Sequence, residues 1–161
     1  MKSIDIILTV ISAICTLASI IGAYRSNKYS NQSKQLNIYA NTNAALIETK
    51  NIISTLTELL KLANNRKRGT SLLIEIRKHG EMIRDSINKI RDTLPANDVK
   101  EINNILNTQE IKIDHYINSF VTGAILVSDK LELDDDFNLC HQKFCDIQVF
   151  IKAKLENLNN K

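Results

Sequence analysis

One uncharged segment near the N-terminus constrains this chain more than any other feature. Residues Ile6 to Tyr24 (IILTVISAICTLASIIGAY) contain no charged side chain over nineteen positions. As an α-helix the segment is about 28 Å long, which is close to the hydrocarbon thickness of a bilayer. A cleaved signal peptide is the alternative, but the positive N-terminal region is thin and no small-residue cleavage motif is present. We therefore predict a retained transmembrane helix within residues 1–25.

The charges beside this segment predict its orientation. On the N-terminal side Lys2 is offset by Asp5. On the C-terminal side come three basic residues, Arg25, Lys28 and Lys34. Because basic flanks are retained in the cytoplasm, we expect a single-pass protein with its N-terminus outside and the rest of the chain inside.

One face of the predicted membrane helix is polar. At 100° per residue, small, hydroxylated and acidic positions fall within about 40° of one line, opposite the branched apolar side chains. In lipid such a face packs against other protein or contacts water, and a single-span chain needs another subunit or protein to cover it. The face is either a packing seam, with hydroxyls bonded to carbonyls of their own helix, or the lining of a small pore in a homo-oligomer. Its members are Asp5, Thr9, Ser12, Thr16, Ser19 and Ala23.

The remainder of the chain has the pattern of an all-α protein. Apolar residues recur at steps of three and four, and one Pro and four Gly leave little punctuation for strands. We predict an antiparallel four-helix bundle with coiled-coil-like packing over residues 36–161. Its helices are expected over about residues 36–63, 70–94, 98–131 and 137–158, the last capped by the acidic run 134–136. The polar stretch 26–35 is either a helical juxtamembrane stalk or a flexible linker.

Charge is unevenly distributed within the predicted bundle. Residues 66–91 carry eight basic and three acidic side chains, whereas residues 129–136 carry five acidic and one basic. These segments either pair with each other in solvent or, on the outer face of the second helix, bind a phosphate-bearing ligand. The loop 66–68 is expected about 40–60 Å from the membrane, too far for contact with lipid headgroups. The candidate ligand-binding residues are Arg66, Lys67, Arg68, Arg77, Lys78, Arg84 and Arg91.

Catalytic and metal-binding patterns are missing from the sequence. Three cysteines form no disulfide framework, and Cys140-His141-x3-Cys145 lacks a second pair of zinc ligands. No Glu stands three residues before His79, His115 or His141, as a ferritin-like carboxylate site requires. There is no phosphate-cradling glycine loop and no nucleophile elbow. We expect neither an enzyme nor a bound metal or cofactor.

This outline resembles the membrane effectors of bacterial anti-phage defence, and the Hailong type in particular. The hydroxyl positions Thr9, Ser12, Thr16 and Ser19 match a pore wall, and the basic segment 66–91 matches a site for an anionic oligomer. The resemblance covers the architecture of the whole chain and includes no diagnostic motif. It implies a pore-forming toxin of the bacterial inner (plasma) membrane, a homo-oligomer of about four subunits, such as a tetramer. An oligodeoxyadenylate signal would hold it closed, and its opening would depolarise the cell.

We therefore predict an antiviral ion-channel effector, gated through its bundle by an anionic nucleotide or oligonucleotide or by a regulatory protein. Membrane lipid and further copies of the chain are its other expected partners. Two alternatives remain open. One is a membrane-anchored helical adaptor that binds a protein partner, and the other is a phage lysis or exclusion protein.

Overall fold

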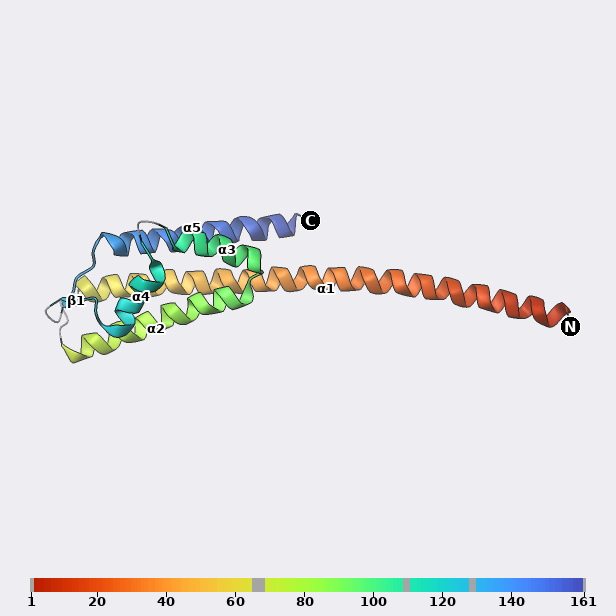
Figure 1. The fold of residues 1–161 in the computed structure, drawn as a ribbon, viewed down its shortest axis with the longest axis horizontal. Coiled ribbons are helices and arrows are strands. Elements are labelled where there is room, and N and C mark those ends of the chain that lie inside the picture. Colours follow the sequence, from red (N-terminus) through yellow and green to blue (C-terminus); the bar gives the residue numbers. More distant parts are fainter. Residues whose placement is uncertain (1, 65–68, 109–110, 128–129, 161) are drawn as a thin grey trace. The chain divides into compact units, whose positions relative to one another are not determined.

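A computed structural model describes residues 2–64, 69–108, 111–127 and 130–160. The chain divides into two compact units, residues 1–38 and residues 39–161. Five helices and one short hairpin account for nearly all of the described residues (Figure 1). The elements are α1 (Lys2–Asn64), α2 (Thr70–Thr93), α3 (Ala96–Leu106), α4 (Ile113–Thr122), β1 (Leu126–Val127), β2 (Lys130–Leu131) and α5 (Asp135–Asn159). The predicted all-helical class is confirmed.

The first unit consists of the N-terminal part of α1. Residues 26–35, for which a stalk and a linker were both open, are helical. Within the part of the chain that the structure describes, no helix combines the length and the hydropathy that a membrane span requires. Much of the predicted span falls on residues 2–7, 9–11 and 13, whose side chains lie outside the described set.

In the second unit, the prediction of a single third helix over residues 98–131 is wrong. Asn107 ends α3 with a non-helical backbone (φ −113°, ψ 79°) and forms an isolated bridge with Lys112. Gly123 ends α4 in the left-handed conformation (φ 79°), which glycine adopts without steric cost. The following residues form the antiparallel pair β1–β2 in place of a helix. The segment therefore folds back twice, and it supplies two short helices where the four-helix prediction had one long one.

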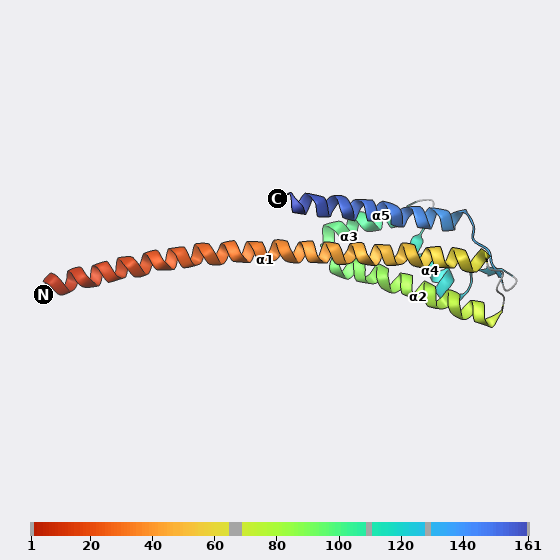
Figure 2. The same cartoon turned by 180° about the vertical axis from the view of Figure 1, so that it is seen from behind.

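These short helices pack differently. Helix α4 lies against α2 and helix α3 lies against α5 (Figure 2). A Cβ built on Gly80 of α2 would lie only 2.8 Å from the backbone nitrogen of Val121 in α4. Glycine at this position therefore permits the close approach of the two backbones.

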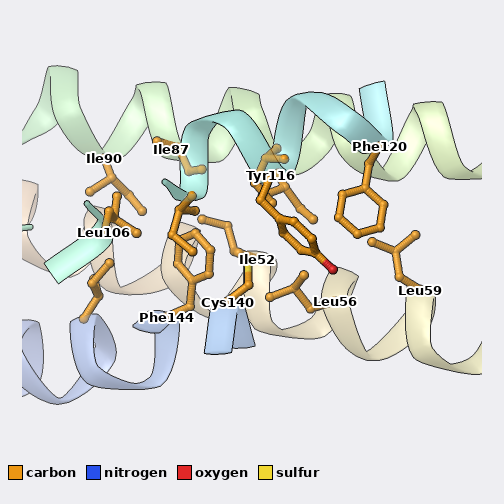
Figure 3. Close-up of a cluster of buried hydrophobic side chains, with 14 of the residues drawn as sticks. Ile52, Leu56, Leu59, Ile87, Ile90, Leu106, Tyr116, Phe120, Cys140 and Phe144 are labelled. Atoms are coloured by element: carbon orange, nitrogen blue, oxygen red, sulfur yellow. The ribbon is translucent and has the colours of Figure 1, made fainter. Parts of the chain in front are cut away.

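Five helices contribute to the hydrophobic core of the second unit. Figure 3 shows Ile52 and Leu56 of α1 facing Tyr116 of α4 and Phe144 of α5. The rings of Tyr116 and Phe120 meet edge to face, with their centroids 5.2 Å apart. Side chains of α2 and α3 complete the cluster, with Ile87, Ile90 and Leu106 among them.

The buried face of α1 differs from the predicted apolar stripe. Leu36, Tyr39 and Leu60 follow the three- and four-residue apolar spacing of the helix predicted over residues 36–63, but they are 69%, 38% and 44% exposed. Threonines occupy part of the buried face instead, at positions 42, 49 and 55. The hydroxyls of Thr49 and Thr55 each donate to the carbonyl four residues earlier, at 2.8 Å. A threonine whose hydroxyl is satisfied in this way can turn its methyl group toward an apolar core.

The start of α5 follows the prediction. Asp134 is the N-cap, and its carboxylate accepts a hydrogen bond from the backbone N–H of Phe137 at 3.2 Å. The same carboxylate oxygen accepts one from the Tyr116 hydroxyl at 2.9 Å. Burial and the neighbouring Asp134 raise the pKa of Tyr116 above its usual value. Asp134 therefore fixes the start of α5 and ties it to α4.

Candidate functional site

The hydroxyl-bearing face of the first unit is the first candidate surface. Thr16 donates a hydrogen bond to the carbonyl of Ser12 at 2.9 Å, and Ser19 donates to the carbonyl of Cys15 at 2.8 Å. These hydroxyls therefore keep their donated bonds within their own helix, while each oxygen keeps acceptor capacity. The side chains of Asp5 and Thr9, the other predicted members of this face, lie outside the described residues.

Large apolar side chains surround this face and are left uncovered. Ile14, Leu17 and Ile20 are 59%, 60% and 61% exposed, and Leu8, Ile21 and Tyr24 are equally open. An extended apolar surface of this kind on a folded chain marks a site of association with protein or membrane.

The basic segment of α2 is the second candidate surface, and Arg91 is already engaged within the fold. One Arg91 guanidinium nitrogen, Nη2, donates to both carboxylate oxygens of Asp114, at 2.8 and 3.1 Å. Its Nε donates to the side-chain oxygen of Asn103 at 3.1 Å. Arg91 thus joins α2 to α3 and α4.

Arg77 also connects two helices, α2 and α4. Its Nη2 donates to the carbonyl of Thr122 at 3.0 Å, in the last turn of α4, where helix carbonyls lack partners within the helix. Lys78 and Arg84 are exposed on α2 and make none of the ion pairs formed among the described residues. The loop residues 66–68 lie outside the described residues. Arg77, Lys78 and Arg84 are all exposed, but of these three described candidates Lys78 and Arg84 are the two that make no hydrogen bond or ion pair with another described residue.

A polar groove between α1 and α2, which no sequence motif predicts, is the third candidate. Glu48 of α1 accepts a hydrogen bond from Ser86 of α2 at 2.8 Å and pairs with Lys89 at 3.4 Å. Burial alone would raise the pKa of Glu48, but the hydrogen bonds from Ser86 and Asn51 and the charge of Lys89 hold it below its usual value. The groove has a volume of about 340 Å³ and is also lined by the carboxylates of Glu58 and Asp85. This acidic lining does not suit an anionic ligand.

Several cysteines and histidines lie in or between the helices of the second unit. Burial raises the pKa of the Cys140 thiol to about 12, so it stays protonated and unreactive. Cys145 lies 3.8 Å from the Nδ1 of His141, one helical turn away. His79 pairs with Glu58 across α1 and α2 at 3.0 Å. Among the residues whose placement is described, no group of three or more potential ligands could hold a metal ion.

The two candidate surfaces differ in how many of their side chains are exposed and not bonded to other helices. In the first unit the apolar and hydroxylated side chains are open, whereas in the second unit Arg77 and Arg91 are used to hold helices together. No family model matches the chain, and no curated protein or solved structure matches it either.

Proposed function

We propose that this chain is a membrane-embedded homo-oligomeric effector. Its N-terminal helix spans the bacterial inner membrane once and associates through its hydroxyl face to form a gated, ion-conducting pore. The observation that carries the proposal is the combination found over residues 6–24. This segment has no charge, its described apolar side chains are open, and one of its faces carries hydroxyls at helical spacing.

Insertion into lipid would bury the exposed apolar side chains of this segment. Burying one leucine or isoleucine side chain is worth about 1.5–3 kcal/mol. Five such side chains of this segment, at positions 8, 14, 17, 20 and 21, are at least 53% exposed. Their combined transfer into lipid therefore favours insertion of this helix.

The hydroxyl face supports a polar path between subunits. Thr16 and Ser19 donate to their own helix, so their oxygens can accept hydrogen bonds from water or help to solvate a cation. A ring of such faces around one axis would create a wettable channel in an otherwise apolar layer. Opening this channel would depolarise the cell, the effect expected of an anti-phage effector.

Control of the pore is proposed to reside in the second unit. Lys78 and Arg84, together with the basic residues 66–68, would bind an anionic nucleotide or oligonucleotide, or an acidic regulatory protein. Charge reversal at both positions (K78E/R84E) should remove the control without unfolding the bundle, because both side chains are exposed. Reversal of Arg91 should instead destabilise the bundle, because its partner Asp114 would then face a like charge.

The pore is tested by closing its proposed lining. The double variant S12L/T16L should abolish the loss of membrane potential that follows induction of the wild-type gene in a bacterium. The variant A18L is the control, because it adds one leucine on the opposite side of the helix. Membrane potential is followed with a voltage-sensitive dye, and the amount of membrane-bound protein is measured in parallel. Full depolarisation by S12L/T16L would contradict the pore.

A membrane-anchored adaptor is the second candidate. It is favoured by the hydrogen bonds that Thr16 and Ser19 donate to backbone carbonyls of the preceding helical turn, which are typical of a dry packing seam. An adaptor would keep its activity when residues 1–25 are replaced by an unrelated transmembrane anchor. A pore-forming effector would lose it.

A further inference from the structure

We propose that Arg25 and Lys28, flanked by Tyr24 and Tyr29, bind the phosphate of an anionic phospholipid headgroup. The site lies on the side of the helix opposite to the hydroxyl face. This inference rests on the membrane insertion proposed above and adds to it the class of lipid that the helix recognises.

The first observation is a long stretch without acidic residues. No Asp or Glu occurs between residues 6 and 47, although Arg25, Lys28 and Lys34 lie within that stretch. None of the ion pairs formed among the described residues involves these three cations. The next acidic residue, Glu48, is already paired with Lys89. The cations at the end of the uncharged segment thus lack a counter-charge from their own part of the chain.

The second observation is where these cations stand on the helix. At 100° per residue, Arg25 and Lys28 fall within about 60° of each other and on the same side as Ile14 and Ile21. The hydroxyl positions 12, 16 and 19 lie on the other side. The basic pair therefore continues the lipid-facing side of the proposed span, so a lipid bound there would not compete with a neighbouring subunit at the hydroxyl face.

The third observation is the hollow in which the basic pair lies. Ile20, Ile21, Tyr24, Arg25, Lys28 and Tyr29 line one open hollow of about 680 Å³. Along the helix its lining is apolar at the end nearer the span, carries both charges next, and ends with Tyr29 and Gln32. A phospholipid has its groups in the matching order from the membrane interior outward, with the acyl chain first and the phosphate next.

The chemistry of the side chains fits a phosphate. The Arg25 guanidinium can donate two parallel hydrogen bonds to phosphate oxygens, and the Lys28 ammonium supplies a further charge. The step of four residues from Tyr24 to Lys28 spans about 6 Å, which matches the depth of the headgroup layer beyond the hydrocarbon. Each basic residue near an anionic membrane surface increases binding about fivefold.

The test compares lipid retention by three forms of the full-length chain. Wild type, R25Q/K28Q and K50Q/K61Q are reconstituted into phosphatidylcholine vesicles with and without phosphatidylglycerol. The control K50Q/K61Q removes the same charge from exposed positions elsewhere on α1. After gentle detergent extraction, native mass spectrometry measures the phosphatidylglycerol that remains bound to each form. Wild type and the control should retain about 25-fold more of it than R25Q/K28Q, given fivefold per basic residue.

Equal retention by wild type and R25Q/K28Q would overturn the lipid site, as would an equal loss in K50Q/K61Q. Inorganic phosphate separates a lipid site from a site for a soluble anion. If it displaced the lipid more strongly than chloride at equal ionic strength, the site would belong to a soluble anion and the proposal would fail. Carbonate extraction of the vesicles separates this inference from the function on which it rests. Firm insertion in both lipids without a preference removes the headgroup site alone, whereas release from both removes the membrane function as well.

Discussion

The two units of this protein use similar residues on α1 in opposite surroundings. In the second unit, Thr49 and Thr55 bond to carbonyls of their own helix and are buried in a core built from five helices. In the first unit, Thr16 and Ser19 make the same bonds but are exposed among exposed apolar side chains. In the second unit, where other helices of the chain pack on α1, the hydroxyl-bearing face is therefore a contact surface. By the same chemistry, we propose that the face in the first unit is also a contact surface, with a partner outside its own chain.

The largest test of this contrast compares two apolar truncations. Phe144 is fully buried, so Phe144→Ala should lower the free energy of unfolding of the second unit by about 3–5 kcal/mol through lost contacts and a cavity. Leu17 is 60% exposed, so Leu17→Ala should leave that free energy unchanged. Urea unfolding of the detergent-solubilised chain, followed by circular dichroism, measures both. Val149→Ala is the control within α5, because Val149 is 66% exposed. A loss for Leu17→Ala as large as that for Phe144→Ala would erase the contrast between the units.

A pair of glycines sharpens the same comparison. A Cβ at Gly80 would lie 2.8–3.0 Å from Val121 and Phe120, so Gly80→Ala should destabilise the second unit by about 1–3 kcal/mol by pushing α2 and α4 apart. A Cβ at Gly22 would meet nothing within 4 Å. Gly22→Ala should instead favour the helix of the first unit by about 0.5–1 kcal/mol. Thermal melts compare the two variants with wild type. The melting temperature should fall for Gly80→Ala, and it should rise or stay unchanged for Gly22→Ala.

High pH should act on the second unit through its buried acids. Burial raises the pKa of Tyr116 above its ordinary value of 10.0, and that of Cys140 from 9.0 to about 12. The unfolded chain then loses these protons at lower pH than the folded chain. Stability is therefore fully present below about pH 9 and declines above it, by up to about 1.4 kcal/mol per pH unit for each group.

Two variants assign this decline. Tyr116→Phe should flatten it above about pH 10, whereas Tyr39→Phe, at a residue that is 38% exposed, should not change it. Urea unfolding at a series of pH values provides the measurement. A decline that survives in the double variant Tyr116→Phe/Cys140→Ala would show that other groups cause it.

The sequence predicted the features that depend on local pattern. Apolar spacing identified the helical class, and the acidic run before Phe137 identified the N-cap of α5, because both effects act within a few residues. The division of residues 98–131 was not predicted. The apolar spacing continues through Asn107 and Gly123, and the backbone reverses there because α3 packs on α5 while α4 packs on α2. Such packing depends on residues distant in sequence.

The candidate sites show the same limit. Counting charges along α2 treated Arg77, Arg84 and Arg91 alike, since nothing in their spacing shows which of them meets a partner. The structure places Arg91 against Asp114 and Arg77 against the end of α4, and it leaves Arg84 exposed. The buried threonines of α1 were not predicted either, because the expected buried face was purely apolar. A threonine whose hydroxyl bonds to its own helix can occupy such a face equally well.

The smallest expected effect is also the most direct test of what the hydroxyl face contacts. Thr→Val keeps the shape of the side chain and removes only the hydroxyl. Thr49→Val should change the unfolding free energy by no more than about 1 kcal/mol, because the carbonyl of Ala45 can still accept its helical backbone bond. If Thr16 lay in the dry seam of an adaptor, as Thr49 lies in a dry core, the wild-type oligomer would show no ion leak and Thr16→Val would leave the oligomer unchanged. The proposed pore predicts instead that the oligomer forms while the leak falls several-fold, because only a wetted hydroxyl contributes to conduction. Cross-linking and membrane-potential measurements on this one variant therefore decide between the pore and the adaptor.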